Sequence, residues 1–296
     1  MRIERYLALL AAAAITAFSA NAQTASFLNV PQDAKELAMG GVNAAEDAGF
    51  VLEDATLDAS VSYFRWNPKG AGSNLINVDL GYKLGNLAIL AEAKVNGYGS
   101  YPVYDGTGAS SGEYTPNEFM AGIGAAYSIT PELAVSLMAK YVGSNIAQEA
   151  KGTAFCADLN VAYKLNDLTL GLLAANIGSK MNYKTVSAPL PMLIKLGARN
   201  DFRFGENFIL DAGVDAGYMT QGSYGSVLAS AGADLKMFDM VSVRAGYHFS
   251  SNAALAPSYV SAGLGFDFSI VSISAAYLFG SLTLSGTLSA TLGIKF

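Results

Sequence analysis

The stretch that decides the fold is Leu284-Ser-Gly-Thr-Leu-Ser-Ala-Thr-Leu-Gly-Ile-Lys-Phe296, at the end of the chain. Every second residue from Leu284 is apolar or glycine, and the residues between them are Ser, Thr, Gly or Lys. Successive side chains of a β-strand point to opposite faces, so this alternation predicts a strand with one apolar and one polar face. Residues 225–237 and 258–268 alternate in the same way.

The same test along the whole chain predicts about 14 strands, each near the length that a tilted membrane strand requires. They are expected at 57–66, 74–84, 86–96, 118–128, 132–142, 153–165, 167–177, 192–201, 207–218, 225–237, 240–249, 258–268, 270–279 and 284–296.

The composition places these strands in a membrane. The chain is 52% hydrophobic, yet after residue 22 it has no uninterrupted apolar run of about 18 residues that could form a membrane helix. In hydrocarbon only helices and closed barrels satisfy all backbone hydrogen bonds. We therefore predict an all-β fold, a transmembrane antiparallel β-barrel.

The connections support an outer-membrane barrel, which combines short inner turns with longer outer loops. The links after even-numbered strands are short, and only 202–206 is longer. After odd-numbered strands they are mostly longer, most clearly at 97–117 and 178–191.

Tyrosines on the apolar faces fall near the strand ends, as expected for two interfacial girdles. The expected inner girdle contains Tyr82, Tyr127 and Tyr163, and the outer one Tyr63, Tyr141, Tyr247 and Tyr277. A terminal Phe296 on the lipid face is typical of barrels inserted by the outer-membrane assembly machinery. Membrane lipid and that machinery are thus expected partners.

Residues 1–22 have the layout of a secretory signal, with Arg2 and Arg5, an apolar stretch at 7–18 and Ala20-Asn21-Ala22 at the end. We expect cleavage there, a plug segment at 23–56, the barrel at 57–296, and a location in the bacterial outer membrane. The single cysteine excludes an intramolecular disulfide. A net charge of −6 makes nucleic acid a poor partner.

The polar faces place charges of both signs inside the barrel. The candidate lumen-lining residues are Glu92, Lys94, Lys140, Lys195, Arg199, Asp211, Asp215 and Arg244, with Asp79, Asp158, Asp234 and Asp267 on the same faces. Our first interpretation is an ion-pair network that fills the lumen, and the alternative is a polar lining for a solute.

Residues 23–56 lack strand periodicity, so we expect them to fold into the barrel as a plug. Small inward residues let other backbone approach closely. The expected sites of close approach are Gly122, Gly124, Ala126, Gly171, Gly263 and Gly265, and Gly40 and Gly41 are the candidate plug element.

The mature start, Phe27-Leu28-Asn29-Val30-Pro31 and then Leu37-Ala38-Met39-Gly40-Gly41-Val42, resembles the PorV/PorQ family of FadL-like outer-membrane proteins. The segment Arg244-Ala245-Gly246-Tyr247 is also similar to that family. The family's Asn-Pro-Ala element is replaced here by Glu53-Asp54-Ala55. The resemblance implies a FadL-like barrel of 14 strands.

The resemblance implies one of two roles. The first is an accessory of type IX-like protein secretion that binds secreted C-terminal signal domains and secretion-system subunits, with a candidate partner loop formed by Tyr98, Tyr101, Tyr104 and Tyr114. The second is a FadL-like channel for hydrophobic small molecules, which needs an apolar pocket. The inward faces show few large apolar residues, namely Leu90, Met138, Leu173 and Leu193, so we rank secretion first.

We expect no enzyme, because the only histidine, His248, is not paired with a serine by spacing. Cys156 is expected to be a small buried thiol. No motif predicts a catalytic residue, a metal site or a cofactor.

Overall fold

A computed structural model describes residues 24–46, 51, 55–66, 72–104, 108–184, 186–280 and 284–296. The predicted signal peptide, Gln23, Glu53 and Asp54 lie outside the described residues. No helix in this part of the chain is long and apolar enough to cross a membrane.

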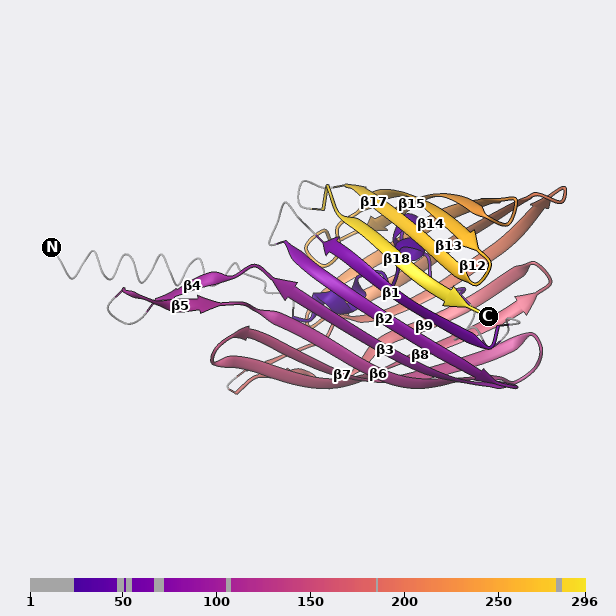
Figure 1. The fold of residues 1–296 in the computed structure, drawn as a ribbon. Helices are drawn as coiled ribbons and strands as arrows, with labels where there is room; N and C mark the ends of the chain where they lie inside the picture. Colours follow the sequence, from indigo (N-terminus) through magenta and orange to yellow (C-terminus); the bar gives the residue numbers. More distant parts are fainter. Residues whose placement is uncertain are drawn as a thin grey trace.

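Fourteen antiparallel strands form a closed barrel, as predicted (Figure 1). The ring closes where β1 pairs with β18, from Asp58 opposite Lys295 to Arg65 opposite Leu288. The barrel strands are β1 (Leu57–Trp66), β2 (Ser73–Leu84), β3 (Leu87–Tyr98), β6 (Asn117–Ser128), β7 (Leu133–Ala147), β8 (Ala150–Leu165), β9 (Leu168–Gly178), β12 (Met192–Phe204), β13 (Phe208–Gln221), β14 (Tyr224–Met237), β15 (Val241–Ser250), β16 (Tyr259–Phe268), β17 (Val271–Gly280) and β18 (Leu288–Lys295).

Four short strands lie outside this ring. β4 (Tyr101–Tyr104) and β5 (Ser110–Tyr114) form a separate hairpin that projects beyond one end of the barrel (Figure 1). β10 (Met181–Asn182) and β11 (Ser187–Ala188) lie in the connection between β9 and β12. Periodicity missed all four because each spans too few residues to show an alternation.

The predicted strand boundaries are wrong at two places in the barrel. β7 and β8 extend to Ala147 and Ala150, so the expected loop there is a tight turn; strands that continue beyond the membrane need no apolar face. The last strand begins at Leu288 rather than Leu284, because Gly286 adopts φ 93°, which ends the extended backbone. Leu284 is therefore packed inside the barrel rather than facing lipid.

The two ends of the barrel differ as predicted. The end that carries Phe296 has short turns, and the expected longer link near Phe202–Glu206 shortens because β12 continues to Phe204. We call this the inner end, since periplasmic turns are the short ones. The seven girdle tyrosines are exposed on the outside of the barrel, and exposed phenylalanines such as Phe204 and Phe238 join them at the inner end.

The segment from residue 24 to residue 46, here called the plug, lies inside the barrel (Figure 1). It contains a 3-10 turn, η1 (Ser26–Asn29), and a short helix, α2 (Ala34–Ala38), that packs against β15–β18. Asp33 caps α2 by accepting a hydrogen bond from the Glu36 backbone N–H at 2.7 Å. The Glu36 carboxylate in turn accepts one from the Gln32 N–H at 2.8 Å, so two unpaired donors at the helix start are satisfied.

Candidate functional site

The plug rests on a belt of glycines in the barrel wall. Six neighbouring strands each place one glycine where an added Cβ would lie within 3.0 Å of a plug atom. These glycines are Gly171, Gly197, Gly213, Gly232, Gly246 and Gly263, from β9 and β12–β16. Because no side chain projects from the wall at these six positions, the plug can approach the backbone of the wall closely.

Gly40 and Gly41 form a turn of the plug directly after Met39, which contacts two glycines of this belt. Their φ angles of 74° and 77° are in the left-handed region that favours glycine, and a Cβ on Gly40 would lie 2.7 Å from the backbone of Tyr247. Of the inward glycines predicted to approach the plug, Gly171 and Gly263 do so. Gly122 and Gly124, on β6, instead contact β7 at Met138, because α2 packs against β15–β18. Gly265 is on β16, but the atoms nearest its Cβ position belong to the Arg244 guanidinium.

Wall side chains bind the plug mostly through its backbone. Lys94 Nζ donates to the Val30 carbonyl at 3.1 Å, and Lys195 Nζ donates to the Gly41 carbonyl at 2.8 Å. Comparable bonds join Asn77 to Gln32, Ser261 to Ala38, Gln221 to Thr24 and Thr291 to Ala34. The plug is thus held by wall side chains that replace the hydrogen bonds its backbone would otherwise make with water.

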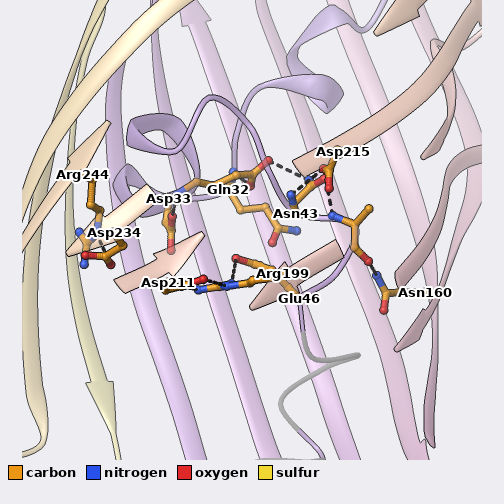
Figure 2. A network of polar contacts seen from close by, with 12 residues as sticks. Gln32, Asp33, Asn43, Glu46, Asn160, Arg199, Asp211, Asp215, Asp234 and Arg244 are labelled. Atoms are coloured by element: carbon orange, nitrogen blue, oxygen red, sulfur yellow. Dashed lines mark hydrogen bonds and ion pairs between the residues drawn. The ribbon is translucent and has the colours of Figure 1, made fainter. Parts of the chain in front are cut away.

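Lys195 and Asp215 join the wall to the plug through a polar network, and Figure 2 shows the part of it around Asp215. Asp215 Oδ2 lies 3.5 Å from Lys195 Nζ and accepts the backbone N–H groups of Asn43 and Ala44 at 2.9 and 3.2 Å. The Asn43 side chain connects Lys195 to Glu36, with distances of 2.9 and 2.8 Å. Burial raises the pKa of the Glu36 carboxyl to about 7, although Lys195 opposes this shift.

The other predicted lumen residues also face inward and pair across strands. Arg199 binds Asp211 and reaches Glu46 of the plug at 3.4 Å (Figure 2). The remaining close pairs are Arg244 with Asp234 at 2.8 Å and Lys140 with Asp158 at 2.6 Å, and Lys94 lies 3.8 Å from Glu92. A charge without a partner would be costly in this enclosed space, so the pairing stabilises a filled lumen.

An apolar cluster lies beside the plug, toward the outer end of the barrel. It consists of Leu173, Ala175, Leu193, Met219 and Leu228 of the wall, with Leu255 and Ala256 from the loop between β15 and β16. All seven line a cavity of about 1490 Å³ inside the barrel. The Asn29 side chain of the plug is 2.9 Å from the Met219 sulfur, so the plug borders the cluster.

The sequence analysis found few large apolar residues on the inward faces, and this cluster shows that some of them meet others that it did not note. The sequence analysis noted Leu173 and Leu193 but not Met219, Leu228 or Leu255. Each of four strands contributes only one or two of these side chains and a loop supplies the rest, so no single stretch of sequence shows the cluster. Leu90 packs elsewhere, near Val51 and five alanines.

The predicted tyrosine loop is the hairpin β4–β5. Tyr101 donates its hydroxyl to the Ile146 carbonyl at 2.9 Å, and Tyr114 donates to the Asn145 carbonyl at 3.3 Å. Tyr98 donates to the buried carboxylate of Glu118 at 2.6 Å. Tyr101 and Tyr114 therefore fasten the hairpin to β7, whereas Tyr98 joins the barrel strands β3 and β6. Tyr104, which is 62% exposed, is the most accessible of the four.

His248 does have a serine partner, contrary to the sequence analysis. Its Nδ1 is 2.9 Å from Ser230 Oγ because the two residues are opposite each other on β14 and β15. The ring stacks on Tyr259 with centroids 5.0 Å apart and is buried under the plug. Cys156 is buried, and the described residues contain no group of three metal-binding side chains.

Comparison with known proteins shows the fold. No protein-family profile and no curated protein matches the sequence. The structure is similar to the toluene transporter TodX of Pseudomonas putida, with a TM-score of 0.59 and 14% identity over 90% of this chain and 97% of that one. The fold is that of a FadL-like outer-membrane barrel. CymD, a monoaromatic hydrocarbon channel, is also similar, with a TM-score of 0.56 and 13% identity over 90% of this chain and 96% of that one.

Proposed function

We propose that this protein is an outer-membrane channel that takes up small hydrophobic molecules from the outside. The observation that carries the proposal is the apolar cluster around Leu193, Met219 and Leu228, which lines the cavity beside the plug. A mostly apolar concave surface inside a protein is the usual form of a binding site for small apolar ligands. TodX and CymD, which share the fold, are described as a toluene transporter and a monoaromatic hydrocarbon channel.

The position of the cluster suits the first step of uptake. It lies toward the outer end, whereas charged residues such as Asp201, Arg203 and Lys236 line the cavity near the inner end. An apolar molecule gains free energy of roughly 25 cal/mol per Å² of surface that it buries in the cluster. The apolar molecule would not gain this free energy beside the charged residues near the inner end. We therefore expect it to be retained at the cluster.

The test uses the methionines as reporters. Protein labelled with ¹³C at its methionine methyl groups is placed in lipid nanodiscs and titrated with toluene. We expect a saturable shift of the Met219 resonance, because that side chain is only 2% exposed and belongs to the cluster. Met192, which is 38% exposed and shares the outward parity of Ile194 and Leu196 on β12, reports toluene that has only dissolved in lipid.

A matched pair of variants completes the test. Leu228→Asp puts a charge in the cluster and should weaken toluene binding at least about tenfold, since a charge without a partner is costly in an apolar site. Ser136→Asp adds the same charge at another position that lines the cavity and should have little effect. A Met219 shift that stays linear, or that survives Leu228→Asp, would refute the proposal.

A second candidate function is the accessory role in protein secretion. The observation that favours it is the hairpin β4–β5, which projects from the outer end and is fastened by Tyr101 and Tyr114 (Figure 1). A rigid hairpin with an exposed Tyr104 could contact secretion-system subunits or a secreted C-terminal signal domain. Binding of such a domain should disappear when residues 102–113 are replaced by a short Gly-Ser linker, and unchanged binding would exclude the hairpin.

A further inference from the structure

The loop at residues 251–258, between β15 and β16, covers the apolar cluster. Leu255 and Ala256 are partly buried and pack against the wall residues of the cluster. Both also line the cavity, together with Ala253, Ala254 and Pro257 of the same loop. The loop therefore extends over the cluster rather than away from the barrel, and we call it the lid.

Asn252 organises the lid. Its backbone N–H donates to Ser226 Oγ at 3.1 Å, and its side-chain amide donates to the Gly225 carbonyl at 3.3 Å. Its carbonyl accepts the N–H groups of Leu255 and Ala256 at 3.0 and 3.1 Å. One asparagine thus ties the lid to the start of β14 and bends it so that Leu255 is held against the cluster.

The lid is bonded to the wall and to itself. The Ser251 N–H donates to the Val227 carbonyl at 3.0 Å, and the Ser250 N–H donates to Ser258 Oγ at 2.9 Å. Within the described residues, no hydrogen bond of the lid reaches the plug. Lid and plug therefore border the cluster through separate sets of hydrogen bonds.

We propose that Leu255 is the residue that selects apolar ligands by size, by narrowing the approach to the cluster from the outer end. This inference rests on the proposed uptake of hydrophobic molecules and adds a specific determinant to it. Shortening Leu255 to alanine removes three carbon atoms from the side chain that covers the cluster. The approach widens while the wall residues Leu193, Met219 and Leu228 keep their contacts.

The experiment compares toluene with the wider molecule naphthalene, using the Met219 methyl resonance in nanodiscs. Leu255→Ala should raise the binding of naphthalene relative to toluene by about tenfold, the lower end of what one apolar group contributes to discrimination. Asn252→Ala, which releases the lid and keeps Leu255, should also reduce the discrimination. Val186→Ala shortens a 64% exposed side chain on another outer loop and should leave the ratio at the wild-type value.

The outcomes separate the two proposals. If the wild-type protein gives no saturable Met219 shift with toluene, the proposed function fails. If toluene binds but Leu255→Ala and Asn252→Ala both keep the wild-type ratio, the function stands and the role of Leu255 is refuted. An equal change in Val186→Ala would also refute it, because the effect would then not be specific to the lid.

Discussion

A methyl group added to the glycine belt should unseat the plug. In Gly246→Ala the new Cβ would lie within 3.0 Å of the Gly40 nitrogen and of the Met39 carbonyl group. These are backbone atoms on both sides of the contact, so neither can move aside by changing a rotamer. Overpacking of this kind costs about 1–3 kcal/mol, which raises the population of the displaced plug roughly 5- to 150-fold.

The single cysteine provides the assay. Cys156 is 6% exposed and packs in a cluster that contains Phe27 and Leu28 of the plug. A maleimide reagent can reach it once the plug has left, so the labelling rate of folded protein should rise in Gly246→Ala by the same factor. Gly122→Ala is the control, because its Cβ would meet the flexible side chains of Met138 and Lys140 instead of the plug.

Two results would refute this reasoning. Gly246→Ala could label at the wild-type rate, which would mean that the wall tolerates the methyl group. Alternatively Gly122→Ala could label equally fast, which would mean that any inward methyl group loosens the barrel. Either outcome would show that the close approach of the two backbones does not hold the plug.

Two further predictions concern the charges that hold the plug. The pKa of the Glu36 carboxyl is about 7 in the seated plug against an ordinary value of 4.5, so the seated plug favours the protonated carboxyl. The free energy that holds the plug in the barrel should therefore be greatest below pH 4.5 and fall by about 3 kcal/mol as the pH rises from 4.5 to 7. The Cys156 labelling rate of wild type divided by that of Glu36→Gln should therefore increase with pH, and a flat ratio would contradict the assignment. Lys195→Ala leaves Asp215 buried without its cation and should destabilise the fold by about 3–5 kcal/mol, seen as a lower thermal midpoint. The double variant with Asp215→Ala should cost less than the sum of the two single changes, and full additivity would show that the pair is not coupled.

The barrel itself could be predicted because its constraint is local. A strand with one face in lipid must alternate along its own sequence, and β1 begins and ends at the predicted residues. The inward positions of Lys195, Arg199 and Asp215 followed from the same parity. The strands of the barrel can thus be predicted one at a time, each from its own sequence.

The site could not be predicted because its residues meet only after the barrel closes. Met219 and Leu228 are single apolar residues on polar faces, and Leu255 is in a loop without periodicity. The contact of Ser230 with His248 depends on the register of two strands, which spacing along the chain does not give. Gly40 and Gly41 were noted, but the six glycines that receive the plug are spread over six strands.

The most direct test of the proposed apolar site is a nuclear Overhauser measurement between toluene and the labelled methionine methyl groups, in nanodiscs of deuterated lipid. The account predicts cross-peaks from the toluene protons to the Met219 methyl group, lost in Leu228→Asp and retained in Ser136→Asp. Cross-peaks confined to Met192, on the outside of the barrel, would contradict it, because toluene would then contact the protein only from the lipid.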